Sequence, residues 1–251
     1  MLGSHLSPYE QASGPLIVVT VPAFNESENL RKCVELLLQE TPLLGEEFRI
    51  VIAEDGSSDG TDVIAQGLER MYPVVMCLHS SRKLGRGLAL KHAWNKVEGD
   101  IYVYVDCDLA TDMKYYPQLI NSIREGNDLA TGSRYIEGAK VHRPFMRELV
   151  SRAYNTLIRM MFKDHVFDHQ IGFKAFSNRL IKNLLNECQS TGWFWDTEII
   201  VRSVYDNYKC VEFPVEWEEK KAKRTPIRRL IRDVMIHGAG LIRLKGYLFS
   251  K

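Results

Sequence analysis

The chain alternates short apolar runs with segments in which apolar residues recur every three or four positions. The short runs are rich in Val, Ile and Tyr, which is typical of strands covered on both faces of a sheet. We expect strands at 16–21, 48–53, 74–78, 101–105 and near Leu129. Helical spacing fills the stretches between them. One helix is expected after a capping-box-like start at Asn25 and Glu28, and a second runs from the turn at 54–60 to about Met71. Two more are expected over 87–97 and 115–125. The alternation predicts an α/β fold with a largely parallel sheet and right-handed crossovers.

The regular alternation of predicted strands and helices ends at about residue 140. Helical patterns then dominate, and two short strand candidates lie among them: the helices are expected at 145–162, 178–188 and 196–206, and the strands at 172–177 and 210–217. The chain shows no linker, internal repeat or low-complexity stretch. We therefore predict a flexible tail over 1–14, one domain over 15–218, and a basic loop with an amphipathic helix over 219–251.

Composition narrows the class of protein. The chain has 251 residues, 45% of them hydrophobic, which excludes wholesale disorder. Lys and Arg number 33 against 32 Asp and Glu, and this balance argues against a dedicated nucleic-acid binder. Five cysteines without a C-x-x-C motif indicate neither a disulfide framework nor a zinc site, and favour a reducing compartment. We expect neither a membrane span nor a secretory signal, since no apolar run reaches about 18 residues.

Acidic and turn-forming residues follow three of the predicted strands. They are the segments 22–26, 54–56 and 106–108. A single acidic turn is ordinary, because Asp and Gly build turns. In open α/β sheets, however, ligands bind beyond the carboxyl ends of the strands, so three such turns at one edge indicate a binding site.

Asp106 and Asp108 directly follow the strand at 101–105. Two carboxylates about 4 Å apart repel by roughly 4 kcal/mol at an effective dielectric constant near 20, and a divalent cation would relieve this repulsion. Oxygen ligands suit Mg²⁺ or Mn²⁺. The alternative is a pair of solvated carboxylates that cap a helix.

An ordered set of motifs makes the pattern more specific. The motifs are VPAFNE (21–26), EDGSSDGT (54–61), RKLGRG (82–87), DCDL (106–109) and GSRY (132–135), extended by DHQIGFK (168–174) and GWFWDTE (192–198). This set resembles the inverting glycosyltransferases of family 2, which have the GT-A fold, and more narrowly the dolichyl- or polyprenyl-phosphate sugar synthases. The resemblance covers about residues 16–225 and implies that 15–218 form a single Rossmann-like GT-A catalytic domain.

The resemblance implies a nucleotide diphosphate sugar as donor. Matching family positions place Pro22, Phe24, Glu26, Asp55 and Cys107 at the nucleotide. Asp106 and Asp108 would hold Mg²⁺ or Mn²⁺ on the diphosphate, which makes Asp108 a catalytic candidate. One departure is Ala110, where mannosyl-type members tend to carry Gln or Ser, so that Thr111, Asp112 or water would have to complete the metal shell.

The acceptor implied by the resemblance is a lipid monophosphate. Arg134, Arg147 and Ser151 match positions that cradle its phosphate, and Arg134 is the second catalytic candidate. Arginine suits phosphate because its planar fork binds bidentately. A largely dianionic phosphate is already a nucleophile, so no general base is needed. Without the family pattern, a buried ion pair for Arg134 and a solvated helix face for Arg147 are the alternatives.

Weaker signals complete the set of candidates. Asp196 could bind sugar hydroxyls or act as a carboxylate at a helix start. Lys220 and Arg224 lie where the family has a mobile loop that contacts the donor. The loop at 82–87 could face a phosphate or simply turn the chain. His169, four residues after His165, is expected to position substrate or a loop rather than to bind zinc.

The stretch 227–235 combines apolar and basic residues at helical spacing. It is typical of a helix that lies on anionic lipid, with a core-packing helix as the alternative. We therefore expect a peripheral enzyme on the cytoplasmic side of a membrane, with docking to an integral membrane partner left open.

The predicted function is transfer of a hexose from a nucleotide sugar to polyprenyl or dolichyl phosphate. The aromatic motifs at 193–198 and 214–217 favour UDP-glucose over GDP-mannose as donor. A polysaccharide synthase would need several spans and a Q-x-x-R-W motif, which the sequence lacks. A non-catalytic nucleotide-binding subunit is the alternative from another class, and the intact Asp55, Asp106, Asp108 and Arg134 argue against it.

Overall fold

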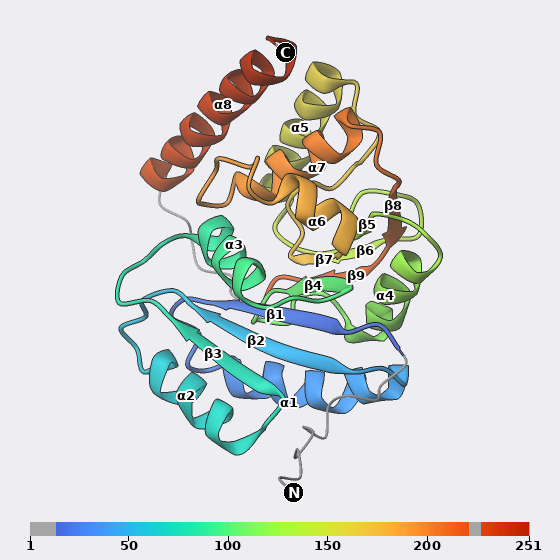
Figure 1. The fold of residues 1–251 in the computed structure, drawn as a ribbon. Helices are drawn as coiled ribbons and strands as arrows, with labels where there is room; N and C mark the ends of the chain where they lie inside the picture. The colour runs from blue at the N-terminus through green and yellow to red at the C-terminus, as the bar shows by residue number, and fades with distance from the viewer. Residues whose placement is uncertain (1–13, 221–226, 251) are drawn as a thin grey trace, which may run out of the picture.

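The computed structural model describes residues 14–220 and 227–250. Its centre is a seven-stranded sheet in the order β3-β2-β1-β4-β7-β5-β8 (Figure 1). The strands are β1 (Ile17–Ala23), β2 (Phe48–Glu54), β3 (Val75–His79), β4 (Ile101–Val105), β5 (Leu129–Ser133), β7 (Phe173–Ser177) and β8 (Cys210–Pro214). β7 runs antiparallel to β4 and β5, and the other pairings are parallel. The predicted α/β fold with a mostly parallel sheet is confirmed.

Helices cover both faces of this sheet. They are α1 (Leu30–Glu40), α2 (Thr61–Met71), α3 (Arg86–Lys96), α4 (Tyr116–Arg124), α5 (Phe145–Phe162), α6 (Asn178–Leu184), α7 (Trp195–Tyr205) and α8 (Ile227–Phe249), with short 3₁₀ turns η1 (Thr41–Leu44) and η2 (Met113–Tyr115). Helices α1, α2 and α4 pack on one face, and α3, α6 and α7 on the other, so that the sheet separates two cores.

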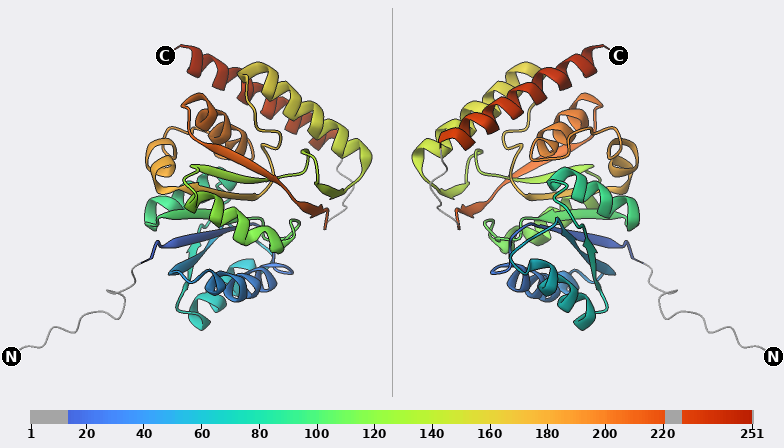
Figure 2. Two further views of the ribbon diagram at one scale, coloured as in Figure 1. Left: turned by 90° about the vertical axis from the view of Figure 1, so that its right-hand side faces the viewer. Right: turned by 90° about the vertical axis from the view of Figure 1, so that its left-hand side faces the viewer.

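Helices α5 and α8 lie side by side outside α7, away from the sheet (Figure 2). A third apolar cluster joins them, in which Ile158 of α5 and Val201 of α7 meet Leu241, Leu244 and Leu248 of α8. The later turns of α8 therefore pack on the domain. The side chains at 227–234, where a lipid-binding helix is expected, lie outside the described part. The predicted boundaries of the tail, the domain and the C-terminal segment, at residues 14 and 218, stay predictions. Within the described residues, no helix is both long and apolar enough to span a bilayer.

One expected helix start is wrong. Asn25 and Glu28 do not cap α1, which begins at Leu30. Asn25 instead takes a left-handed conformation, with φ of 55°, which Asn tolerates better than most residues. Its side-chain oxygen accepts a hydrogen bond from the backbone N–H of Ser58, 2.9 Å away. The turns after β1 and β2 are thereby tied together at the edge where ligands are expected.

The strand expected at 210–217 is split in two. β8 ends at Pro214, which has no N–H to donate. The chain leaves β5 after one more hydrogen bond, from the Val215 N–H to the Ser133 carbonyl oxygen at 3.2 Å. The next strand, β9 (Glu216–Glu218), pairs in parallel with β6 (Lys140–His142), a three-residue strand too short to show in the sequence pattern. This small sheet brings the segment before α5 against the segment after β9.

Candidate active site

A cavity of about 160 Å³ opens at the carboxyl ends of β1, β2 and β4. It is lined by Pro22, Ala23, Phe24, Glu26, Asp55, Lys83, Arg86, Ala89, Asp106, Cys107, Asp108 and Trp193. Seven residues expected at the donor, namely Pro22, Phe24, Glu26, Asp55, Asp106, Cys107 and Asp108, are among them. They converge because β1 lies between β2 and β4 in parallel register, which places the three turns at one edge.

Asp55 shapes one wall of this cavity. The residue is 4% exposed. Its carboxylate accepts hydrogen bonds from the backbone N–H groups of Leu84 and Gly85. In the same loop, the Lys83 ammonium lies 3.4 Å from the centre of the Phe24 ring, a cation–π contact. Asp55 therefore orders the loop at 82–87, and its expected contact with the base stays a prediction.

Arg86, the first residue of α3, joins two acidic groups. Its guanidinium lies 3.1 Å from the carboxylates of both Asp106 and Asp196, and its centre is 3.8 Å from the centre of the Trp193 ring. The side chain is 6% exposed, so these pairs are screened little by solvent. Sequence analysis found Arg86 only as one cation in a possible phosphate loop. The structure brings it to the cavity, next to a predicted metal ligand.

Asp196 lies behind the cavity and does not line it. It is 1% exposed and accepts hydrogen bonds from Tyr104, Lys174 and Arg86. Burial raises the pKa of Asp196 to about 7, against the opposite effect of Arg86, and burial lowers the pKa of the enclosed Lys174 to about 7. A direct contact between Asp196 and a sugar is therefore not supported by this placement. Asp196 positions Arg86 instead.

The carboxylates of Asp106 and Asp108 can supply two ligands to a cation. The Asp106 side chain is 35% exposed and packs so closely on Gly172 that a Cβ there would overlap its carboxyl group. Asp108 accepts a hydrogen bond from the backbone N–H of Ala110 at 3.1 Å. Two carboxylates at the rim of a polar cavity fit Mg²⁺ or Mn²⁺, since Mg²⁺ commonly takes one or two carboxylates together with substrate phosphates and water.

Of the other candidates for the metal shell, Thr111 lines a small recess together with Asp106, whereas Asp112 lines neither this recess nor the cavity. Asp112 caps η2 by accepting a hydrogen bond from the Lys114 N–H at 2.9 Å, and it forms an ion pair with the Lys114 side chain. Thr111 is buried and forms a bridge with Trp217. Among the residues that the structure describes, no three His, Cys, Asp or Glu side chains form a metal-binding group. Asp112 is thus engaged with η2 and Lys114, and Thr111 or water stays the predicted completion of the metal shell.

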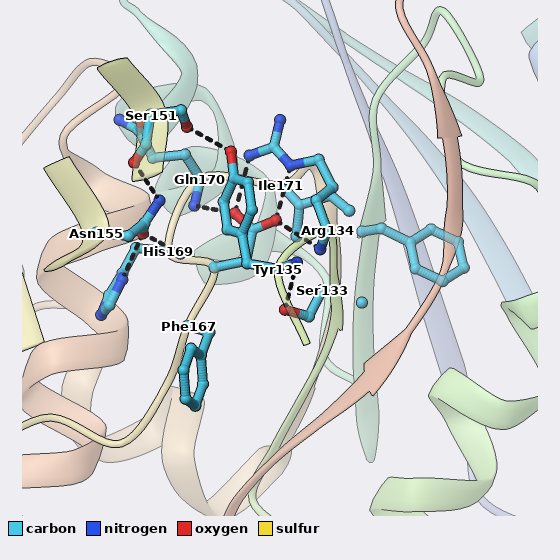
Figure 3. Close-up of polar contacts among 12 residues, drawn as sticks. Ser133, Arg134, Tyr135, Ser151, Asn155, Phe167, His169, Gln170 and Ile171 are labelled. Carbon is cyan, nitrogen blue, oxygen red and sulfur yellow. Dashed lines mark hydrogen bonds and ion pairs between the residues drawn. The ribbon is translucent and has the colours of Figure 1, made fainter. Parts of the chain in front are cut away.

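Arg134 is the centre of a second, basic site. Its guanidinium binds Asp168 through two hydrogen bonds of 2.7 and 2.8 Å, and its backbone N–H adds a third (Figure 3). Burial alone would raise the pKa of Asp168, but the Arg134 guanidinium lowers it. Arg134 is thus held in a buried ion pair. The same small recess is lined by both Asp106 and Trp217, and the Trp217 ring centre lies 5.1 Å from the Arg134 guanidinium.

Tyr135 connects Arg134 to α5. Its hydroxyl donates to Ser151 at 2.6 Å, and Arg147, one turn earlier on α5, forms an ion pair with Glu219. The structure therefore brings the predicted residues Arg134, Arg147 and Ser151 together. Sequence analysis missed Arg143, Trp217 and Glu219 as members. Trp217 was visible only within the motif at 214–217.

His169 ties the loop that carries Asp168 to α5. Its Nδ1 lies 2.8 Å from the Asn155 side-chain oxygen and its Nε2 lies 3.1 Å from Asp164. Asn155 in turn donates to the Ser151 carbonyl oxygen at 2.9 Å (Figure 3). The imidazole is fully buried, so His169 holds a loop, as expected.

Lys220 is not brought to the cavity. It forms a surface ion pair with Glu218 at 2.8 Å. Arg224 lies outside the described residues.

Comparison with known proteins agrees with this geometry. A model described as glycosyl transferase family 2 matches residues 18–186, from β1 into the turn after α6. The chain belongs to glycosyl transferase family 2. The match includes every residue of the acidic cavity except Trp193, and it includes Arg134, Arg147 and Ser151.

Three curated relatives are similar over most of this family 2 chain. Glycosyltransferase AglD of Haloferax volcanii is 38% identical over 92% of the chain, dolichol-phosphate mannosyltransferase of Pyrococcus furiosus 31% over 87%, and polyprenol monophosphomannose synthase of Mycolicibacterium smegmatis 28% over 81%. The matched region spans 37%, 62% and 78% of these relatives, respectively. The first two are thus considerably longer than the part they share.

Solved structures confirm the GT-A fold of this family 2 chain. Glucosyl-3-phosphoglycerate synthase from Mycobacterium tuberculosis, in complex with Mn²⁺, uridine diphosphate and glucosyl-3-phosphoglycerate, has a TM-score of 0.69 at 19% identity, covering 93% of this chain and 81% of that one. A complex of the same enzyme with Mg²⁺ and uridine diphosphate has a TM-score of 0.66.

Proposed function

We propose that the protein transfers a hexose from a nucleotide diphosphate sugar to a polyprenyl or dolichyl phosphate. The observation that carries this proposal is the adjacency of two sites of opposite charge. Asp106 and Asp108 line a cavity sized for part of a nucleotide sugar. Asp106 also lines a recess with Trp217, and the guanidinium groups of Arg134 and Arg143 lie over the Trp217 ring. The similarity to polyprenol- and dolichol-phosphate mannosyltransferases supports a lipid monophosphate as the acceptor.

On the donor side, Asp106 and Asp108 would hold the divalent cation. When bound, the cation stabilises negative charge that develops on the leaving nucleoside diphosphate. Arg86 is the nearest described cation to Asp106 and is aimed by Asp196, so it can face the same diphosphate. The loop ordered by Asp55 carries Lys83 over Phe24 at the nucleotide end of the cavity.

On the acceptor side, Arg134, Arg147 and Ser151 would orient the lipid phosphate. One phosphate oxygen attacks the anomeric carbon of the sugar, and the bond from that carbon to the diphosphate oxygen breaks with its electron pair. The nucleoside diphosphate leaves and the anomeric configuration inverts. Because the phosphate is largely dianionic near neutral pH, no proton has to be removed from the nucleophile.

Two donors are compatible with the site. The aromatic motifs around Trp193 and Trp217 favour UDP-glucose, as in the sequence analysis. The relatives from Pyrococcus furiosus and Mycolicibacterium smegmatis, both named for mannose, favour GDP-mannose. UDP-glucose remains our first choice.

The test is incubation of the purified chain with labelled UDP-glucose or GDP-mannose, together with polyprenyl phosphate and Mg²⁺. We expect label to enter the organic-solvent phase from one donor, with UDP-glucose the faster, and EDTA to stop it. Label in that phase from neither donor would contradict the proposal.

The outer surface of α5 and α8 suits a membrane. Large apolar side chains are exposed along both helices, flanked by basic ones: Phe145, Met146, Leu149, Leu157, Met160, Met235, Ile242 and Phe249, with Arg152, Lys163, Arg243 and Lys245. The stretches 145–163 and 235–250 together contain one acidic residue, Glu148, which pairs with Arg152. We propose that this surface lies on the anionic cytoplasmic face of a membrane, where the lipid acceptor is available.

Glutamate substitutions at the outer surface test this placement. Met160→Glu with Ile242→Glu should reduce cosedimentation with vesicles containing anionic phospholipid by about tenfold, because two carboxylates oppose both apolar burial and the surface charge. The same change at Leu43, 79% exposed on η1 directly after α1, should have no effect, since α1 packs on the other face of the sheet from α7. Equal loss in the double variant and in the Leu43 control, or no loss in either, would contradict the assignment.

A further inference from the structure

The arginine cluster contains one cation more than the family pattern supplied. Arg143 follows β6, and its guanidinium lies 5.2 Å from the Trp217 ring centre, while that of Arg134 lies 5.1 Å from the same ring. Its Nη1 also approaches the Tyr135 hydroxyl at 3.5 Å. Arg143 therefore shares an aromatic neighbour with Arg134 and a hydroxyl neighbour with Ser151, which are two of the three residues expected at the acceptor phosphate.

Glu219 is placed between Arg143 and Arg147. One of its carboxylate oxygens binds Arg147, and the other lies 4.0 Å from the Arg143 Nε, too far for a hydrogen bond. The backbone fixes this position, since the Glu219 N–H donates to the His142 carbonyl oxygen at 3.0 Å. Glu219 and Arg143 are thus set side by side by the pairing of β6 with β9.

The polar groups of this arrangement are incompletely satisfied. The side chains of Arg143 and Glu219 are each 13% exposed. Within the described residues, neither the Arg143 Nε nor the Glu219 Oε2 has a hydrogen-bond partner, although both atoms are buried. Buried donors and acceptors without partners are unfavourable, so a ligand that satisfies them gains affinity. Burial, and then the charge of Arg134, lowers the pKa of Arg143.

The charges in the cluster also favour a stronger anion. Asp168 is engaged by Arg134 through three hydrogen bonds. Among the described residues, Glu219 is the carboxylate that lies within ion-pair distance of both Arg143 and Arg147. A phosphate monoester offers three acceptor oxygens and a charge of about −1.5 to −2 at neutral pH. It can therefore satisfy donors that a carboxylate with two oxygens and a single charge leaves unpaired.

We propose that Arg143 is a third arginine of the acceptor-phosphate site, and that Glu219 occupies the phosphate position until the acceptor displaces it. The inference rests on the proposed function for the identity of the acceptor. Arg143 then contacts the substrate, whereas Glu219 is an internal competitor whose removal strengthens phosphate binding.

Binding of farnesyl monophosphate, a soluble prenyl phosphate, to the full chain tests the inference by calorimetry. Glu219→Gln should tighten binding by about fivefold, because the competing charge is lost while the shape is kept. Arg143→Gln should weaken binding by about tenfold, because a charge-assisted pair with phosphate is lost. Glu218→Gln is the matched control, since Glu218 is the preceding residue, its side chain is 62% exposed and its carboxylate pairs with Lys220 at the surface. It should leave binding unchanged.

A kinetic split separates this role from a structural one. In the transfer assay, Glu219→Gln should lower KM for the lipid phosphate and leave KM for the nucleotide sugar unchanged. In the Arg143→Gln background, the effect of Glu219→Gln should shrink, because the two residues act on one site. If Arg143→Gln does not fold, Arg143→Lys keeps the charge without the fork and should give a smaller loss.

Two results would overturn the inference: unchanged or weaker prenyl-phosphate binding in Glu219→Gln, or full affinity in Arg143→Gln. Failure of the proposed function looks different. Tighter binding in Glu219→Gln without any labelled lipid from either donor would retain the phosphate site and remove the transfer reaction. Transfer with no response to Glu219→Gln would remove this inference alone.

Discussion

Replacement of Asp108 by asparagine is expected to reduce sugar transfer by about a thousandfold or more while the protein stays folded. Asp108 lines the cavity at the end of β4, next to Cys107 and opposite the turns after β1 and β2. An amide keeps the size of the side chain and removes the charge that a hard cation requires. The loss should appear in kcat at saturating donor and lipid phosphate.

Asp112→Asn is the matched control for this variant. Asp112 is four residues away, but it caps η2 and pairs with Lys114 outside the cavity, so transfer should remain within about twofold of the wild type. Thermal unfolding of both variants checks that the fold is retained. An undiminished rate in Asp108→Asn, or a full rate for the wild type in metal-free buffer, would contradict the role assigned to Asp108.

The second large effect concerns stability. Asp168→Ala should lower the free energy of unfolding by about 3–5 kcal/mol, because it leaves the Arg134 guanidinium charged and buried without its partner. Asp168 is fully buried, Arg134 is 7% exposed, and three hydrogen bonds join them. Urea unfolding measures the change. Glu35→Ala, which breaks an exposed pair with Arg31 on α1, should cost less than about 1 kcal/mol.

The same ion pair gives the stability a pH dependence. The pKa of Asp168 is lowered in the folded protein, so its contribution is present above the unfolded value of about 3.9. It is lost as the pH falls through the lowered folded pKa. Below about pH 4, the difference in stability between the wild type and Asp168→Ala should therefore shrink. A cost under about 1 kcal/mol at neutral pH would show that the pair is not the anchor of Arg134.

The local hydrophobic pattern of the sequence predicted the main helices and strands well. The strand at 101–105 and the helix at 145–162 have the expected bounds, because each is a continuous apolar or amphipathic run. The acidic cavity was also predictable. Once the sheet is parallel, the residues after β1, β2 and β4 must share an edge, which is sufficient to bring Asp55 and Asp106 into one cavity.

Contacts between distant segments were not predictable in this way. Arg86 and Asp196 are 110 residues apart, and only the packing of α3 against α7 shows that they pair. The helical pattern at 196–206 did not reveal that Asp196 points inward to this pair. Glu219 and Arg143 meet through β6 and β9, two three-residue strands that leave no periodic signal.

The most direct test of the account follows the oxygen atoms of the acceptor. Polyprenyl phosphate labelled with ¹⁸O in its phosphate is incubated with the donor, Mg²⁺ and the chain, and the masses of the products are measured by mass spectrometry. The account predicts a lipid monophosphate hexose that retains all the acceptor label, and an unlabelled nucleoside diphosphate, because a phosphate oxygen attacks the sugar carbon. A lipid diphosphate sugar, label in the nucleotide, or free hexose as the main product would contradict it.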